Sequence, residues 1–323
     1  MYDIPPILDD YLNYMETIKG LSPNTVKEYF FDLRTFFRFI KMRYRLVKND
    51  TPFDEIEIHD VDVDLIKKIN IQDLHAYISY IDKVKLNGNF SKSRKIASLK
   101  SFFKYLYSIV NLIDNNPADK LEFPKTDKRH PTYLTLEECE RLLKTILDNK
   151  NEYYRKRDYA IVMLFLNCGL RLSELASINI NKIKDDTLTV IGKGNKERTI
   201  YLNKSCIDAI NDYLEVRPKD PIDKDALFLS KRKTRMSNRA IQHMIDKYLE
   251  RAGFDISVYS THKLRHTAAT LMYKHGNVDI RALQEILGHK NVSTTQIYTH
   301  IDNERLREAV KSNPLANIEI KNR

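Results

Sequence analysis

The sequence contains little cysteine and no long apolar run. Its three cysteines, Cys139, Cys168 and Cys206, are scattered among 323 residues, and no two of them have the spacing of metal ligands. An odd, scattered set does not suggest a disulfide framework, so we expect reduced thiols. No apolar stretch approaches membrane-spanning length, and the first residues lack the basic and apolar pattern of a signal peptide. We therefore expect a cytoplasmic protein without a membrane partner.

Patterns that hold nucleotides or catalytic metals are absent as well. The segment Gly192-Lys193-Gly194 is no P-loop, because the Gly-x-x-x-x-Gly-Lys-Ser/Thr spacing is missing. His262 and His266 are four residues apart, as zinc ligands can be, but no glutamate follows His262 and no acidic cluster lies nearby. A metal-dependent nuclease is therefore disfavoured, and we expect neither a cofactor nor a bound metal.

Positive charge is present in excess, and it is unevenly distributed. The net charge is +10. Residues 1–124 hold 18 Lys+Arg and 18 Asp+Glu, whereas residues 125–323 hold 36 and 26, so the second part carries the whole excess. Many proteins are basic, but this distribution fits a polyanionic partner such as nucleic acid.

The first part of the chain has helical periodicity. Ser22-Pro23 is typical of a helix start, with serine as the N-cap and proline in the first turn. Apolar residues at three- and four-residue steps predict helices around residues 26–40, 74–81 and 96–107. Between the first two, residues 46–64 are acidic and irregular, which indicates a surface insertion. We expect a small, all-helical first domain over residues 1–123.

The second part has a different pattern. Residues 124–132 lack apolar side chains and hold two prolines, which is typical of a linker. Thr135 and Glu138 then form a capping box for a new helix. The β-rich runs 187–191 and 198–202 flank a glycine-containing turn and predict a hairpin, while helical patterns fill the remainder. The sequence thus predicts a mainly α fold with a small β-hairpin, in which residues 133–323 form the second domain.

Five side chains suited to phosphoryl transfer occur in order in the second domain. Tyrosine can attack phosphorus, arginines can hold phosphate oxygens through forked hydrogen bonds, and histidine exchanges protons near neutral pH. A glycine turn before the first arginine can present it to a cleft, where Glu174 can orient it. The five residues are Arg171, His262, Arg265, His289 and Tyr298.

These motifs resemble the catalytic domain of the tyrosine recombinases, the phage-integrase family, and most of all the Xer site-specific recombinases. The resemblance covers roughly residues 8–312 and is far stronger after residue 160. Residues 191–198 are similar to the hairpin that carries the family's catalytic lysine, which implies Lys193 as general acid, with Lys196 as the second candidate. It further implies Tyr298 as nucleophile, Arg171 and Arg265 as phosphate clamp, His262 as proton acceptor or phosphate donor, and His289 as second donor.

The resemblance also implies an architecture and partners. It implies a helical, SAM-like core-binding domain opposite a mixed α/β catalytic domain, closing as a C-shaped clamp on a double-stranded DNA site. Xer-like proteins pass their C-terminal tail to a neighbour in a cyclic tetramer, and the tail here, residues 303–323, can begin with a short helix. A cell-division DNA translocase is a further partner that the resemblance allows. The DNA-contacting residues we expect are Thr25, Lys27, Arg34, Lys92, Arg94, Lys95 and Lys196.

Three alternatives to a Xer recombinase that resolves chromosome dimers stay open at this point. The first is an integrase- or transposase-type recombinase of a mobile element, which uses the same chemistry. A catalytically idle DNA-binding protein would share the charge pattern, although all the expected catalytic residues are present. The metal-dependent nuclease is the third reading. The DNA target sequence is not specified by any motif, because base readout depends on side-chain placement.

Overall fold

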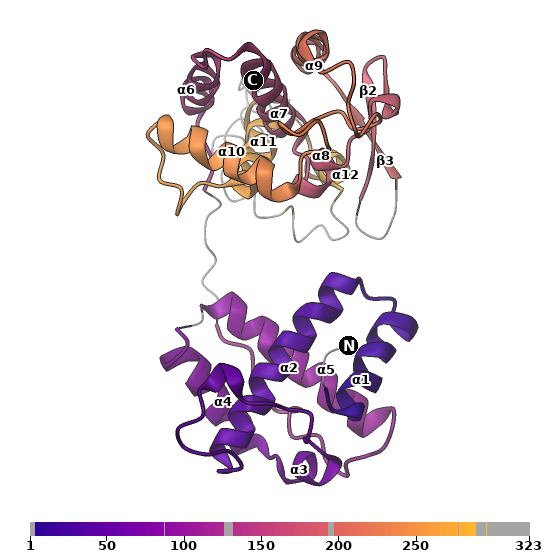
Figure 1. Ribbon diagram of the computed structural model, residues 1–323, viewed down its shortest axis with the longest axis vertical. Helices are drawn as coiled ribbons and strands as arrows, with labels where there is room; N and C mark the ends of the chain where they lie inside the picture. The colour runs from indigo at the N-terminus through magenta and orange to yellow at the C-terminus, as the bar shows by residue number, and fades with distance from the viewer. Residues whose placement is uncertain are drawn as a thin grey trace, which may run out of the picture. The chain divides into compact units, whose positions relative to one another are not determined.

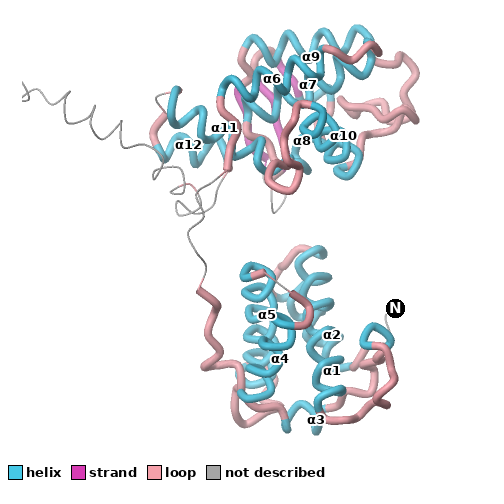
Figure 2. The backbone as a smooth tube through the Cα atoms, turned by 90° about the vertical axis from the view of Figure 1, so that its left-hand side faces the viewer, coloured by secondary structure: helices cyan, strands magenta, loops and turns pink. Residues whose placement is uncertain are grey.

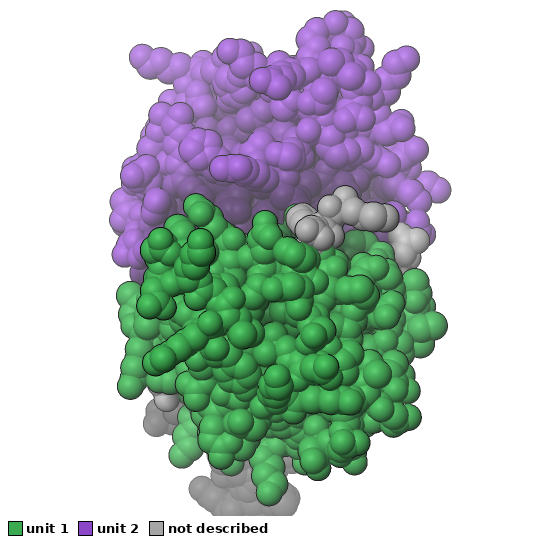
Figure 3. Space-filling model, turned by 60° about the horizontal axis from the view of Figure 1, so that its bottom comes forward, with its two compact units in different colours: residues 1–128 green, residues 129–323 purple. Residues whose placement is uncertain are grey.

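A computed structural model of the chain describes residues 4–86, 88–125, 132–192, 197–276, 278–288 and 295. The chain divides into two compact units, Met1–Lys128 and Arg129–Arg323, which Figure 3 colours separately. The described residues are mostly helical, with one small antiparallel sheet, which confirms the predicted fold class (Figure 1). None of their helices is both long and apolar enough to pass through a lipid bilayer.

Among the described residues of the first unit, every regular element is a helix. Ser22 caps the long second helix by accepting a hydrogen bond from the Thr25 N–H, as predicted. Its core is rich in aromatic rings, and Phe36 packs edge-on against both Tyr77 and Phe103. A π-helical turn at Tyr14–Ile18 follows the first helix. The helices are α1 (Pro6–Asn13), α2 (Pro23–Arg43), α3 (Val63–Lys68), α4 (Ile71–Lys83) and α5 (Asn89–Ser108).

The acidic segment 46–64 is irregular for most of its length, as expected, but it is anchored to α2. Its apolar residues Ile56, Ile58 and Val61 are buried, while the acidic residues between them are exposed. The Lys41 ammonium lies 2.6 Å from the Asp60 carboxylate. The segment is therefore a packed surface layer rather than a free loop.

The second unit is built around α7 (Glu152–Cys168), a buried helix that packs against α6, α9 and α11. Thr135 and Glu138 form the predicted capping box at the start of α6. Figure 2 shows α11 and α12 side by side, and these two helices carry residues of the candidate site. The other helices are α6 (Leu136–Leu147), α8 (Leu172–Ala176), α9 (Lys204–Val216), α10 (Asn238–Arg251), α11 (Thr261–His275) and α12 (Ile280–Leu287).

The predicted hairpin is present, but it belongs to a three-stranded sheet. Strands β2 (Thr187–Ile191) and β3 (Glu197–Tyr201) pair antiparallel, and β1 (Ile183–Lys184) pairs with β2 on its other edge. Strand β1 has only two residues, which is too short to show alternation, so it could not be predicted. The expectation that helices fill the remainder was wrong for residues 218–237, which form an irregular segment with isolated bridges. Two prolines in this segment oppose a helix.

Candidate active site

A left-handed turn presents the first of the candidate arginines. Gly169 ends α7 with φ 57°, as the glycine pattern predicted, and Arg171 is the N-cap residue of α8. A Cβ atom at position 169 would lie 2.8 Å from the Leu287 side chain. Both the backbone angle and this contact require glycine, which lets the turn press directly against the C-terminal end of α12.

The C-terminal end of α12 collects three arginines, Arg171, Arg198 and Arg265, which we call the arginine cluster. Arg198 donates to the carbonyl of Ile286. Arg265 donates to the next carbonyl, that of Leu287, at 2.5 Å, and Arg171 donates to the Gly288 carbonyl at 2.8 Å. The last carbonyls of a helix lack partners within the helix and carry partial negative charge. The three guanidinium groups satisfy them in sequence.

Glu174 is the shared carboxylate of the arginine cluster. It is 1% exposed, and its two oxygens lie 2.7 Å from Arg171 and 2.8 Å from Arg198, with Arg265 at 3.8 Å. Burial alone would raise the pKa of this carboxyl group, but the hydrogen bonds from Arg198 and Arg171 lower it below its usual value. Glu174 is thus ionised at neutral pH and orients Arg171, as the sequence predicted.

The arginines of the cluster differ in their exposure. The side chain of Arg171 is 33% exposed, that of Arg198 15% and that of Arg265 6%. Arg265 also donates to the Gly169 carbonyl at 2.6 Å, so it joins the ends of α7 and α12. Arg171 is therefore the member of the cluster that is most accessible to an incoming phosphate.

His262 lies one turn before Arg265 on α11, as its spacing predicted. Burial, Arg265 and Lys263 together lower the pKa of the imidazole from its usual value, because each disfavours the imidazolium form. Its ring meets the His266 ring edge-on, with centroids 4.7 Å apart. At neutral pH His262 is therefore a neutral base that can accept a proton.

Four of the predicted catalytic residues and candidates, Lys193, Lys196, His289 and Tyr298, lie outside the described residues, as does the C-terminal tail. Their flanks are described. Ile191 pairs with Glu197, which closes the hairpin on either side of residues 192–196. Gly288 has a left-handed φ of 62° and ends α12, as predicted, directly before position 289.

The sequence did not predict a site role for Arg198. Strand alternation holds a usable signal, because Arg198 and the buried Ile200 are two residues apart on β3 and share a face. An arginine on an inward face needs a carboxylate or carbonyl partner. That partner, Glu174, is 24 residues away in the sequence, and no local pattern connects the two.

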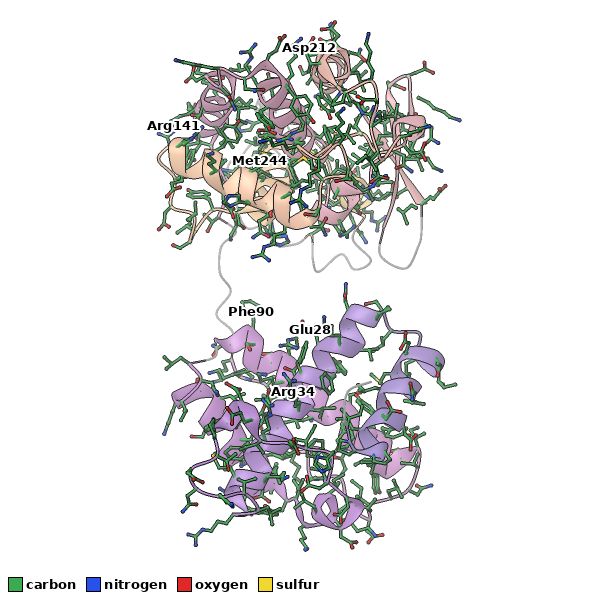
Figure 4. All side chains as sticks on the ribbon, viewed as in Figure 1. Glu28, Arg34, Phe90, Arg141, Asp212 and Met244 are labelled. Atoms are coloured by element: carbon green, nitrogen blue, oxygen red, sulfur yellow. The ribbon has the colours of Figure 1, made fainter. Side chains whose placement is uncertain are left out.

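The predicted DNA-contacting residues of the first unit fall into two groups. Arg34 lies over the ring of Phe31 of α2, with 4.9 Å between guanidinium and ring centroid, and Lys27 lies over the same ring at 5.8 Å (Figure 4 labels Arg34). The remaining described members hold protein partners. Thr25 meets the Ser22 hydroxyl, Lys92 pairs with Asp82, Arg94 with Glu28 and Asp32, and Lys95 with Asp32.

The predicted DNA-contacting role of Lys95 is corrected by its ion pair. Its side chain is only 10% exposed, and its ammonium lies 2.8 Å from the fully buried carboxylate of Asp32. The same carboxylate holds Arg94 at 2.7 Å. A lysine paired inside the domain stabilises the contact between α2 and α5, so we no longer count Lys95 among the DNA-contacting candidates. The basic periodicity of α5 could not reveal this pairing, because Asp32 is 63 residues away.

Metal ligation has no candidate in the part of the chain that the structure describes, where no three His, Cys, Asp or Glu residues form a group that could hold an ion. The three cysteines are buried and free.

Comparison with known proteins identifies the family. The model of the phage integrase family matches residues 132–305. The chain is 57% identical to "Tyrosine recombinase XerC" of Caldanaerobacter subterraneus subsp. tengcongensis over 97% of its own length and 88% of that protein. It is 35% identical to the XerC of Shewanella amazonensis over 95% of both chains.

A solved structure shares the fold. The XerH site-specific recombinase bound to a palindromic difH substrate superposes with a TM-score of 0.70 at 21% identity, covering 95% of this chain and 94% of that one. The chain belongs to the phage integrase family of tyrosine recombinases, and its relatives are of the Xer type, which confirms the predicted family.

Proposed function

We propose that the protein is a site-specific recombinase of the Xer type that cuts and rejoins DNA through Tyr298. The phenol oxygen attacks a backbone phosphorus, a 3′-phosphotyrosine forms, and the 5′ oxygen leaves with a proton. A partner strand's 5′-hydroxyl then attacks the ester, and repetition on the second strand passes through a Holliday junction. The ester conserves the bond energy, so the reaction needs no ATP. The arginines supply the positive charge at the phosphate, so the mechanism uses no metal ion.

The arginine cluster is the observation that supports this proposal most strongly. Three guanidinium groups and the ionised Glu174 are assembled at the end of α12, directly before His289 and ten residues before Tyr298. Positive charge fixed in place stabilises a phosphorane, whose charge exceeds that of the ground-state phosphodiester. Arg171 and Arg265 hold the non-bridging oxygens in this mechanism.

Proton transfer is assigned to the remaining residues. His262, which is neutral at pH 7, accepts the phenol proton, and His289 donates a hydrogen bond to phosphate. Lys193 protonates the leaving 5′ oxygen, and Lys196 is the alternative.

Lys27 and Arg34 of the first unit contact the DNA backbone through charge.

The biological role we propose is resolution of chromosome dimers in the cytoplasm. Each protomer binds a double-stranded site through both domains, which clamp the duplex, and four protomers form a ring through their C-terminal tails. A cell-division DNA translocase activates the complex. The relatives named XerC support this role, as does the fold shared with XerH on its difH substrate.

Covalent capture on fragmented DNA of the host tests this function. The protein is incubated with the fragments in excess chelator, denatured, and the DNA that remains attached is sequenced. We expect attachment at one position near the chromosomal terminus, and no attachment by Tyr298→Phe. Attachment at the ends of a mobile element would replace the chromosomal role by the integrase-type role. Absence of attached DNA, with normal duplex binding, would indicate an idle DNA-binding protein.

A further inference from the structure

Arg198 occupies a central place between three parts of the catalytic unit. It lies on β3, two residues after the undescribed hairpin tip, and its side chain crosses to Glu174 on α8 and to Ile286 at the end of α12. A Cβ atom at Gly288 would lie 3.0 Å from its Cδ and 3.1 Å from its Nε. Its side chain therefore packs directly against the backbone that leads to position 289.

We propose that Arg198 is a positioning residue for DNA cleavage, which sets the Arg171 guanidinium by holding Glu174 and the end of α12 in register. This inference rests on the proposed recombinase function. Arg198 itself does not bind the phosphate in this account. It acts on Arg171 through Glu174 and the end of α12.

The geometry at Glu174 supports this role. One carboxylate oxygen accepts from the Arg171 guanidinium at 2.7 Å, and the other accepts from the Arg171 backbone N–H and from Arg198, both at 2.8 Å. Arg198 contacts both oxygens, because its Nε also lies 3.4 Å from the oxygen that the Arg171 guanidinium binds. This forked contact fixes the orientation of the carboxylate that pulls on Arg171.

The end of α12 gives a second, independent route to Arg171. Arg171 donates to the Gly288 carbonyl, and Arg198 donates to the Ile286 carbonyl two residues earlier. Loss of Arg198 would remove one hydrogen-bond partner from the carboxylate and another from the helix end, the two groups that fix Arg171. Small misplacements of a clamp group slow a reaction strongly while they change ground-state binding little.

A purely structural role makes a different prediction. If Arg198 served only to neutralise buried Glu174, its removal would lower stability, and cleavage would fall only as far as the folded fraction does. Arg217 offers a matched control. It is a partly buried arginine of the same unit, and its guanidinium donates to the carbonyls of Ala226 and Leu227 rather than to Glu174.

The test is a double-mutant cycle on a nicked substrate that traps the covalent complex. Single-turnover rates at saturating protein, duplex affinity and thermal midpoint are measured for Arg198→Ala, Arg171→Lys, the double variant and Arg217→Ala. We expect Arg198→Ala to slow covalent complex formation about 10- to 100-fold, with affinity nearly unchanged. The double variant should be no slower than Arg171→Lys alone, because both changes act on one group.

Arg198→Lys keeps the charge beside Glu174 but loses the second arm to Ile286. Arg198→Lys should therefore give a rate between those of the wild type and Arg198→Ala. If Arg198→Ala does not fold, Arg198→Lys replaces it in the double-mutant cycle with Arg171→Lys. Additive losses in the double variant would overturn the proposal, as would a rate unchanged in folded Arg198→Ala. A rate loss in proportion to the fall in thermal midpoint, equal to that of Arg217→Ala, would also overturn it. If the wild-type protein forms no covalent complex at all, the recombinase function itself fails first.

Discussion

At the scale of single residues, the guanidinium groups of the arginine cluster differ in exposure and in hydrogen-bond partners. Arg171 is the most exposed of the three, whereas Arg265 is enclosed and bonded to the carbonyls of Gly169 and Leu287. A guanidinium can serve two carbonyls and still present further N–H donors, because it has five. Arg265 can therefore be held rigidly by two carbonyls and still donate to a phosphate.

The forked shape of Arg171 should matter more than its charge. We expect Arg171→Lys to lower the single-turnover cleavage rate by about 10²- to 10³-fold, the typical cost of one lost transition-state donor. Duplex affinity should change only a few-fold. Lys27→Ala is the matched comparison, since it should weaken duplex binding and leave the rate of bound complexes unchanged. Equal losses in affinity and rate for Arg171→Lys would make it an ordinary phosphate anchor.

His262 predicts the pH dependence of cleavage. Its pKa is lowered by burial and by Arg265, so the neutral base form persists below the ordinary histidine range. The rate should therefore stay level as pH falls from 7 and decline only when pH passes below His262's depressed pKa. His262→Asn should lose this decline along with much of the rate, whereas His275→Asn should keep it. An acid decline that is the same in His262→Asn would assign the titration to another group.

At the scale of elements, short sequence patterns predict where several helices begin and end. The Ser22 cap, the capping box at Thr135, and the left-handed glycines that end α7 and α12 follow from short sequence patterns. The short strand β1 and the irregular segment 218–237 could not be predicted in this way, because neither has a periodic sequence pattern.

The candidate site was predictable only in part from the sequence. Motif spacing identified Arg171, His262 and Arg265, and the structure brings Arg171 and Arg265 to one helix end. Arg198 was missed because its partners come from α8 and α12, which are distant in sequence. Lys95 was misassigned for the same reason, since its ion pair spans two helices. Periodicity reports which face a residue occupies and not which distant group it meets.

The β2–β3 hairpin carries the proposed general acid. A sulfur in place of the bridging 5′ oxygen leaves without protonation, so such a substrate should restore cleavage by Lys193→Ala to near the wild-type rate. The measurement is single-turnover cleavage of oxygen- and sulfur-bridged substrates by Lys193→Ala and Lys196→Ala. Rescue of Lys196→Ala alone would move the role to Lys196, the other lysine between the paired residues Ile191 and Glu197.

At the scale of the whole molecule, the two units differ in charge. The first unit is neutral over residues 1–124, where many of its basic residues hold protein partners such as Asp32, Asp60 and Asp82. The second part carries the whole net charge of +10. We expect binding to be dominated by the second unit and to weaken steeply with salt.

The C-terminal tail should govern assembly rather than binding. Its expected helix, residues 303–311, is too short to be stable alone, because isolated helices need about 12–15 residues. We expect deletion of residues 305–323 to leave binding of one protomer to DNA largely intact and to impair tetramer formation and recombination on paired sites. Normal recombination by the truncated protein would refute tail exchange. Deletion of residues 318–323, which keeps the expected helix, is the matched control.

Identification of the residue that becomes attached to DNA tests the central claim most directly. The covalent complex, trapped on a nicked substrate in excess chelator, is digested with protease and nuclease and the linked peptide is sequenced by mass spectrometry. We predict one phosphotyrosine, at Tyr298, joined to the 3′ side of the cleaved strand, and no adduct from Tyr298→Phe. Attachment through another residue, linkage to the 5′ side, or an undiminished adduct from Tyr298→Phe would contradict the account.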